Sequence, residues 1–257
     1  MGTTDSKLEA FARLLKIMDE LRAQCPWDRE QTTESLRHLT IEETYELSDA
    51  ILDNDSEEIK KELGDILLHI IFYSKIGSEK NQFDIEDVIN SLCEKLIRRH
   101  PHIYSDVKAE DSDTVTRNWE QIKLKEKGPK KNSVLAGVPK SMPALVKAYR
   151  MQEKAANVGF DWENKEQVWD KVEEEIIEFK QGISAEEREE EFGDLLFSLV
   201  NYARFENINP DDALEKTNKK FIKRFNYIEE KAAEIGKDLK DMTLGEMDGF
   251  WNEAKKL

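Results

Sequence analysis

An internal duplication constrains the fold of this chain more than any other feature. Five short segments of the first half return in the same order in the second half. The pairs are CPWDREQ with GFDWENKEQ, EETYE with EEIIE, ELGD with EFGD, EKLIRRH with KKFIKRF, and NWEQIK with FWNEAK. Small differences in spacing between the segments would be absorbed by loops. The pattern therefore predicts two copies of one domain in tandem.

The spacing of apolar residues predicts that both copies are helical. Apolar side chains recur at helical intervals, and no segment shows the alternation of a half-buried strand. Examples are Leu8, Phe11, Leu14, Leu15 and Met18 in the first half, and Phe221, Phe225 and Ile228 in the second. Glycine, at 11 of 257 residues, and proline, at 6, are scarce. We expect an all-α chain.

One segment is a candidate linker between the two copies. Three of the 6 prolines fall within GPKKNSVLAGVPKSMP, residues 128–143, close to the middle of the chain. Proline and glycine interrupt helices most strongly. We therefore predict an N-terminal domain at 1–127, a linker at 128–144 and a C-terminal domain at 145–257.

Charge and composition exclude several classes of protein. The net charge of −16 argues against a general affinity for nucleic acid polymers, because phosphates bind to positive surfaces. No uncharged apolar run is long enough to span a membrane, and the N-terminus lacks the apolar core of a signal peptide. Cys25 and Cys93 form no CxxC or paired framework. They indicate reduced thiols in a cytoplasmic protein.

Two acidic pairs in the second half point to a metal site. Glu175 and Glu178 are three residues apart, as are Glu191 and Asp194, so each pair shares one face of a helix. The short loop between them allows the two helices to run antiparallel and present four carboxylates to one point. Without a partner, these charges would raise one another's pKa values and destabilise the fold. A cation with oxygen ligands removes the problem, which favours Mg²⁺, with Mn²⁺ as the alternative.

The repetition of this pattern decides between a site and an ordinary surface. In a chain that is 37% charged, an isolated acidic pair is usually a solvated helix face, and SAEEREEE at 184–191 is mostly of that kind. Here the acidic pairs stand next to apolar runs and occur in both halves. Gly64 and Gly193 separate the two acids of ELGD and EFGD. We expect them to make room for a neighbouring helix or a ligand, because glycine inside a helix is otherwise unfavourable.

The histidines and the remaining motifs exclude other metal and nucleotide chemistries. No histidine follows a glutamate by three residues, as a ferritin-like di-iron site requires. The zinc motif HExxH, the phosphate-binding loop GxxxxGK[ST] and the hydrolase motif GxSxG are all missing. Carboxylates alone remain as the candidate ligands.

These residues resemble a known family. EEIIE followed by EFGD, and EETYE followed by ELGD, are similar to the EExxE…ExxD signature of the all-α nucleoside triphosphate pyrophosphohydrolases of the MazG family. CPWD, RRHPHIY, SVLAGVP and EMDGFWNEAKK also resemble MazG segments, so the resemblance covers essentially the whole chain. It implies tandem four-helix domains assembled as a homodimer. It also implies Mg²⁺-dependent hydrolysis of nucleoside triphosphates to monophosphate and pyrophosphate, which would cleanse the nucleotide pool.

The resemblance also implies roles for individual residues. In the C-terminal domain it makes Glu175, Glu178, Glu191 and Asp194 metal ligands, Glu174 an outer-shell or water-orienting acid, Lys220 and Arg224 phosphate contacts, and Trp251 a nucleotide contact. The N-terminal counterparts are Glu43, Glu46, Glu62 and Asp65 as ligands, with Glu42, Lys95, Arg99 and Trp119. The resemblance ranks the C-terminal site as the main one, although both acidic sets are complete.

The basic and aromatic residues support this interpretation in part. Lys220 and Arg224 lie one helical turn apart, and Lys95 and Arg99 repeat the spacing. A lysine and an arginine on one face can donate charge-assisted hydrogen bonds to phosphate oxygens. As single residues they would be exposed helix charges, and each tryptophan could equally be a core residue or stack on a base.

Two alternatives stay open at this level. One is a narrower enzyme on the same scaffold, acting on a deoxynucleotide such as dUTP or dCTP, or on a guanosine alarmone. The other is a helical scaffold or regulatory partner without activity, whose acidic faces bind protein. A nucleotide panel separates these possibilities.

Overall fold

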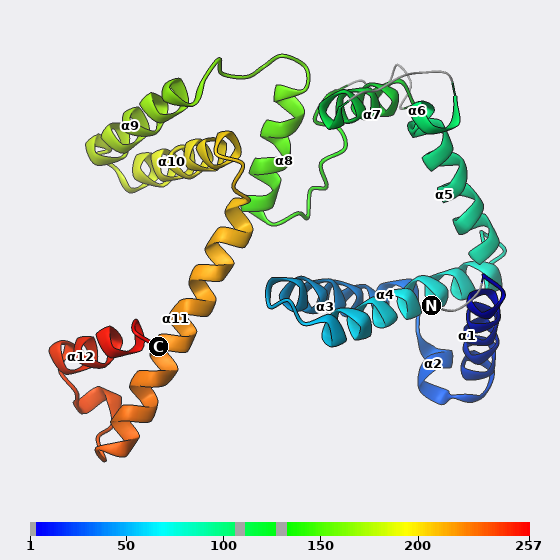
Figure 1. The fold of residues 1–257 in the computed structure, drawn as a ribbon, viewed down its shortest axis with the longest axis horizontal. Helices are drawn as coiled ribbons and strands as arrows, with labels where there is room; N and C mark the ends of the chain where they lie inside the picture. Colours follow the sequence, from blue (N-terminus) through cyan, green and yellow to red (C-terminus); the bar gives the residue numbers. More distant parts are fainter. Residues whose placement is uncertain (1–3, 106–110, 127–132) are drawn as a thin grey trace. The chain divides into compact units, whose positions relative to one another are not determined.

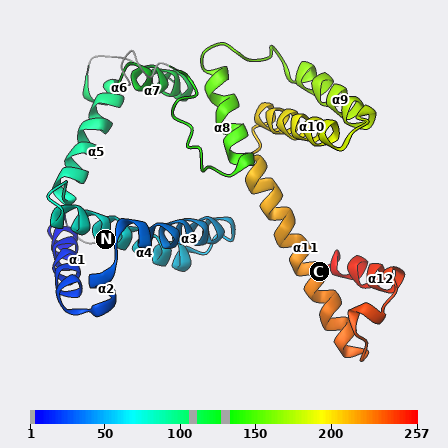
Figure 2. The same cartoon turned by 180° about the vertical axis from the view of Figure 1, so that it is seen from behind.

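The computed structural model describes residues 4–105, 111–126 and 133–257. The regular elements in these ranges are all helices, which confirms the all-α prediction (Figures 1 and 2). The chain divides into two compact units, residues 1–122 and 123–257. The predicted domain boundaries and the linker at 128–144 stay predictions. Residues 127–132 of that region lie outside the described ranges, and 133–143 form turns and irregular segments.

The first unit is a helical hairpin with one long helix before it and one after it. Its elements are α1 (Thr4–Gln24), α2 (Pro26–Glu30), α3 (Thr33–Leu52), α4 (Ser56–Glu79), α5 (Ile85–Arg99), α6 (Pro101–Tyr104) and the start of α7 (Ser112–Glu126). Helices α3 and α4 lie side by side, and α1 packs against α4 (Figure 1). This arrangement places the acidic segments of α3 and α4 opposite each other.

The core of the first unit joins α1 to the hairpin. Its buried members are Met18, Leu36, Ile71, Phe72 and Ile76, and the partly buried Phe11, Leu14 and Leu15 pack against them. The predicted apolar stripe of α1 is therefore confirmed except at its start. Leu8 is 63% exposed and lies outside this core.

The second unit repeats this plan. Its elements are α8 (Ala144–Ala156), α9 (Lys165–Gln181), α10 (Ala185–Phe205), α11 (Pro210–Glu234), the 3₁₀ turn η2 (Leu239–Asp241) and α12 (Leu244–Ala254). Helices α9 and α10 form the hairpin, α8 packs against α10, and α12 packs against α11 (Figure 1). On α11, Ile228 is buried, but Phe221 is 56% exposed, so the predicted apolar stripe there is only partly covered.

Polar caps define where the hairpin helices begin. The Thr32 side chain accepts a hydrogen bond from the Ser35 backbone N–H at the start of α3, and Asp55 does the same for Glu57 and Glu58 at the start of α4. Asn54, in the turn between them, adopts a left-handed backbone with φ of 55°. In the second unit, Asn164 caps α9 and Ser184 forms a capping box on α10. Such caps stabilise each helix end by about 1 kcal/mol.

Both units leave large apolar side chains at the surface. In the second hairpin and α11 these include Ile177, Phe192, Leu196, Phe197, Leu214, Phe221 and Ile222, each more than 40% exposed. An exposed apolar surface of this extent is typical of an interaction surface. Within the described ranges, no helix is both long and apolar enough to cross a membrane.

Candidate active site

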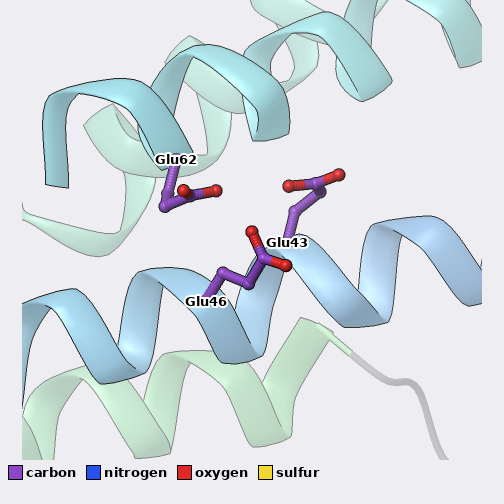
Figure 3. A group of neighbouring side chains, drawn as sticks. All are labelled: Glu43, Glu46 and Glu62. Atoms are coloured by element: carbon purple, nitrogen blue, oxygen red, sulfur yellow. The ribbon is translucent and has the colours of Figure 1, made fainter. Parts of the chain in front are cut away.

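The first unit gathers three carboxylates between the two helices of its hairpin. Glu43 and Glu46 project from α3, and Glu62 projects from α4 towards them (Figure 3). One oxygen from each lies within 4.8 Å of the others. The i,i+3 spacing on α3 and the antiparallel pairing with α4 bring together three of the four acids that the sequence predicts to converge.

The negative charges in this group shift one another's pKa values. Burial, followed by the charge of Asp65, raises the pKa of Glu43 above its ordinary value. The negative charge of Glu62 is the main cause of the raised pKa of Glu46. Carboxylates that raise one another's pKa values repel, and a cation bound between them would relieve this repulsion.

Glu62 is the most buried member of this group, and its two oxygens differ. The side chain is 3% exposed, and Lys61 Nζ lies 2.8 Å from Glu62 Oε1. The hydrogen bond from Lys61 lowers the pKa of Glu62. Glu62 Oε2 is buried and has no hydrogen-bond partner. A buried carboxylate oxygen without a partner is costly, so this atom is a candidate metal ligand.

The second unit contains a matching group. Glu175 and Glu178 on α9 and Glu191 on α10 bring one oxygen each within 4.8 Å of the others. Burial raises the pKa of Glu191, and the charges of Glu178, Glu175 and Asp194 raise it further. Two of the three acids therefore come from one helix and the third from its hairpin partner, as in the first unit.

Glu175 repeats the asymmetry of Glu62. Its side chain is 7% exposed, and Lys171 Nζ lies 2.6 Å from Oε1, while Oε2 is buried without a partner. The hydrogen bond to Glu175 is the main cause of the raised pKa of Lys171. Each unit thus has one lysine-paired carboxylate with a free buried oxygen, beside two further acids. Such a set of hard oxygen donors fits a divalent metal ion.

The two units build this arrangement from opposite helices of the hairpin. By the repeat, Glu62 corresponds to Glu191, and Glu175 corresponds to Glu43. The buried acid therefore comes from the second helix in one unit and from the first in the other. The lysine partner changes position accordingly, because Lys61 adjoins Glu62 and Lys171 precedes Glu175 by one turn.

The remaining predicted acids lie at the edges of these groups. Asp65 and Asp194 are outside the close sets, yet their charges act on Glu43 and Glu191. Glu174 is exposed and forms an ion pair of 3.0 Å with Lys171. Glu42 is exposed, and its charge contributes to the raised pKa of Glu46.

The two glycines between the acids do not provide close helix packing. A Cβ atom at Gly64 or Gly193 would meet nothing within 4 Å. The prediction that a neighbouring helix approaches there is wrong for contacts within the chain, because both glycines lie on an exposed face of the hairpin. The approach of a ligand at these glycines stays a prediction.

The predicted basic and aromatic residues pair with each other in both units. The Arg224 guanidinium lies 5.3 Å from the ring centroid of Trp251, and Arg99 lies 5.2 Å from that of Trp119. Lys220 is exposed and Lys95 half-buried, each one turn before its arginine. The repeated arginine–tryptophan contact joins α11 to α12 and α5 to α7.

In the second unit these residues lie away from the carboxylates. Helix α12 packs on the distal part of α11, whereas the α9–α10 hairpin lies beside α8 and the start of α11 (Figures 1 and 2). In the described part of this unit, the predicted metal ligands and the predicted substrate-binding residues therefore belong to separate regions. The roles of Lys220, Arg224 and Trp251 stay predictions.

Comparison with known proteins decides the family. The family model of the MazG nucleotide pyrophosphohydrolase domain matches the chain twice, at residues 31–104 and 163–228. The chain belongs to the MazG family. The two MazG matches include both carboxylate groups and the Lys95–Arg99 and Lys220–Arg224 pairs, whereas Trp119 and Trp251 lie outside them.

Two curated relatives that are named nucleoside triphosphate pyrophosphohydrolases match nearly the whole chain. A Thermotoga maritima protein named nucleoside triphosphate pyrophosphohydrolase/pyrophosphatase MazG is 46% identical over 247 residues, 95% of each chain. An Escherichia coli nucleoside triphosphate pyrophosphohydrolase is 42% identical over 95% of this chain and 96% of its own. The uncharacterized protein YabN of Bacillus subtilis is 49% identical, but the match spans 52% of that longer protein. The MazG resemblance and the tandem domain architecture are thereby confirmed.

Two features of the site were not foreseen from the sequence. One is the lysine partner of each buried acid. Lys171 could have been found from its i,i+4 spacing to Glu175, whereas Lys61 has no such signal. The other is a hydrogen-bonded group beside the first site, in which Thr40 Oγ1 lies 2.7 Å from His69 Nδ1 and 2.6 Å from the Tyr73 hydroxyl. Burial lowers the pKa of His69.

A cavity adjoins the carboxylates of the second unit. Its volume is about 780 Å³, and Glu175, Asp194 and Lys171 form part of its wall. The rest of the lining is largely apolar and includes Trp162 and Phe197. A cavity of this size and composition is suited to a small organic ligand.

Proposed function

We propose that this chain hydrolyses nucleoside triphosphates to nucleoside monophosphate and pyrophosphate, using Mg²⁺ held by the carboxylates of its hairpins. The second unit would carry the main site, with Glu175, Glu178, Glu191 and Asp194 as ligands. Glu43, Glu46, Glu62 and Asp65 would form the corresponding site of the first unit. Since Cys25 and Cys93 are free thiols, we place the enzyme in the reducing cytoplasm.

One observation carries this proposal. In each unit, a buried glutamate has one oxygen on a lysine and the other without a partner, at the centre of an acidic group. Such a centre is unfavourable unless a cation or protons neutralise it. Family membership adds the substrate, because MazG relatives are named for nucleoside triphosphate pyrophosphohydrolysis.

The proposed chemistry assigns separate tasks to the chain's own residues. A bound Mg²⁺ would supply Lewis acidity towards water and phosphate oxygens. Glu174 would accept a proton from the attacking water, and Glu42 would do so in the first unit. Glu174 is exposed on the same helix as two ligands, and its present ion pair with Lys171 keeps it beside Glu175.

The basic residues would act on the phosphate chain. Lys220 and Arg224 would donate hydrogen bonds to the pyrophosphate oxygens, where negative charge develops as the bond breaks. Trp251 would hold the Arg224 guanidinium in place through their cation–π contact and touch the nucleotide. Lys95, Arg99 and Trp119 would have the same tasks in the first unit.

We further propose that the active form is a homodimer. Within one chain, α12, which carries Trp251 beside Arg224, packs on α11, and the α9–α10 hairpin and α11 expose many apolar side chains. A second copy that covered these surfaces could bring its own α11 to the hairpin. Analytical ultracentrifugation is expected to give twice the mass of the chain. A single-chain mass in an active preparation would contradict this part of the proposal.

A nucleotide panel tests the activity itself. The purified chain would be incubated with the eight common ribo- and deoxyribonucleoside triphosphates, dUTP and a guanosine tetraphosphate, with and without Mg²⁺. We expect pyrophosphate and monophosphate from the triphosphates only when the metal is present. Release of single phosphate, or turnover without a divalent metal, would be inconsistent with the proposed reaction.

Variants then assign the activity to the two units. Glu62→Gln disables the first group and Glu175→Gln the second, because each removes the charge of the buried acid. Matched controls are Glu57→Gln on α4 and Glu189→Gln on α10, which are exposed and lie outside both groups. We expect Glu175→Gln to remove most of the activity and the controls to keep it. Full activity of the Glu62→Gln, Glu175→Gln double variant would refute the site assignment.

A further inference from the structure

The large cavity of the second unit is a chamber lined by carboxylates, by apolar side chains and by the ion-paired Asp161 and Arg204. Glu175 and Asp194 form one part of its wall, and Met151, Phe160 and Trp162 form another. Its volume of about 780 Å³ is in the range of pockets that enclose small molecules. A molecule bound at the carboxylates through charged groups could therefore place an apolar ring in the chamber.

Several polar residues line this cavity, among them Asp161, Asn201 and Arg204, and Gln152 differs from these in having a buried acceptor without a partner. It lies on α8 and is only 7% exposed. Its Nε2 donates a hydrogen bond of 2.8 Å to the backbone carbonyl of Phe197 on α10. Its Oε1 is buried and has no partner. Because the carbonyl must receive a donor, the orientation of the amide is determined, and Oε1 is left as an acceptor.

A buried acceptor of this kind is unfavourable unless a donor reaches it. Gln152 lines the cavity, so a ligand there is positioned to supply that donor. Nothing in the fold requires an amide at this place for helix formation, since it lies within α8 rather than at a cap. The acceptor is therefore available to a donor of a ligand bound in the cavity, while the amide nitrogen joins α8 to α10.

The first unit differs at the equivalent place. One turn after Asp65 stands His69, which is buried and hydrogen-bonded to Thr40. The corresponding position after Asp194 is Ser198, whose hydroxyl turns back to the Leu195 carbonyl and which lines the cavity. The small serine leaves open a space that a histidine side chain would reduce. The chamber is thus built into the second unit by its own residues.

We propose that this cavity receives the nucleoside part of the triphosphate, and that Gln152 Oε1 accepts a hydrogen bond from a donor of that nucleoside. The donor is either an amino group of the base or a hydroxyl of the sugar. The inference rests on the proposed function, because the phosphates would occupy the adjoining carboxylate site. In this arrangement the base contacts Trp162 and Phe160, and Trp251 lies with Arg224 at the phosphates.

Substrate analogues test this without changing the protein. The Glu62→Gln variant isolates the second site, and kcat/KM would be compared for ATP, purine riboside triphosphate, 2′-deoxy-ATP and 3′-deoxy-ATP. The first analogue lacks the amino group of the base, and the others each lack one sugar hydroxyl. Loss of the donor that Gln152 accepts is expected to lower kcat/KM by about tenfold. The analogue that shows the loss identifies the donor.

A variant then links the loss to Gln152. In Gln152→Met on the same background, ATP and the affected analogue are expected to have nearly equal kcat/KM values. The control is Gln181→Met, an exposed glutamine at the end of α9, which should keep the wild-type discrimination. A folding defect would lower all substrates together and leave their ratio unchanged.

The outcomes separate the two proposals. If the parent protein treats ATP and every analogue alike, or if Gln152→Met keeps the discrimination, the role of Gln152 is refuted while the enzyme activity stands. If the protein turns over no triphosphate at all, the proposed function fails and this inference fails with it. If Gln152→Met does not fold, an analogue series without any discrimination still refutes the role of Gln152.

Discussion

Lys171 Nζ lies 2.6 Å from one oxygen of Glu175, while the other oxygen of that carboxylate is buried without a partner. The lysine therefore neutralises part of the charge of the acidic group and leaves one ligand atom free. Lys61 and Glu62 form the same relationship in the first unit.

Lys171→Met should destabilise the metal-free protein. The variant leaves the buried charge of Glu175 without its cation, and the free energy of unfolding should fall by about 1–2 kcal/mol. This is below the value for a fully buried pair, because the Lys171 side chain is 34% exposed. Mg²⁺ should recover most of the loss. Thermal unfolding with and without Mg²⁺ measures both effects.

The control for this prediction is Lys165→Met on the same helix. Lys165 pairs with Glu206 at 2.8 Å, away from the acidic group, and half of its side chain is exposed. Its replacement should change stability little and leave the response to Mg²⁺ intact. Equal behaviour of the two lysine variants would argue against a cation site at Glu175.

Stabilisation by Mg²⁺ should increase with pH. The pKa values of Glu43, Glu46 and Glu191 are raised from the ordinary value of 4.5. The folded state therefore binds more protons than the unfolded state, and the contribution of these groups falls as pH rises through their raised pKa values. Glu62 has the opposite sign, because Lys61 lowers its pKa. A metal ion relieves the repulsion and competes with the protons.

Melting temperatures with and without Mg²⁺ at pH 5 and pH 8 check this relation. We expect the larger increase on adding metal at pH 8. The Glu191→Gln variant, which lacks one of the raised groups, should show a weaker dependence on pH. A metal effect that is independent of pH would contradict the coupling.

Arg224→Gln should lower kcat/KM for triphosphates by about tenfold or more, since a charge-assisted hydrogen bond to phosphate would be lost. Its contact with Trp251 predicts a smaller decrease for Trp251→Leu, because the guanidinium would lose its support but keep its charge. Lys223→Gln, an exposed neighbour on α11, is the matched control. Steady-state kinetics measure both variants. If Lys223→Gln lowers kcat/KM as much as Arg224→Gln does, Arg224 does not have the proposed role.

Thr40→Val should destabilise the first unit by about 1–3 kcal/mol. The hydroxyl of Thr40 is shared by His69 and Tyr73, and His69 is 6% exposed, so its Nδ1 would be left without a partner. Thr44→Val, one turn further on α3, removes an exposed hydroxyl and should change the stability by less than about 0.5 kcal/mol. Urea unfolding of both variants measures the difference. A loss of stability in Thr44→Val but not in Thr40→Val would contradict a stabilising role of the hydrogen bond between Thr40 and His69.

The sequence alone predicted the helices, their tandem repetition and the convergence of the acids. These depend on local periodicity: Glu43 and Glu46 share a face because a helix has 3.6 residues per turn, and a short turn must return the next helix beside it. The same argument holds for Glu175 and Glu178. The pairing of lysine and arginine at i,i+4 on α11 is local in the same way.

Only the tertiary structure decided which acids are buried and what surrounds them. Glu62 in one unit and Glu175 in the other become the buried, lysine-paired acid, although the repeat does not align them. Gly64 and Gly193 face open space, and Gln152 meets Phe197 across two helices. Burial and hydrogen bonding between helices depend on side chains distant in sequence, so the helical period determines which face a residue occupies but not what that face meets.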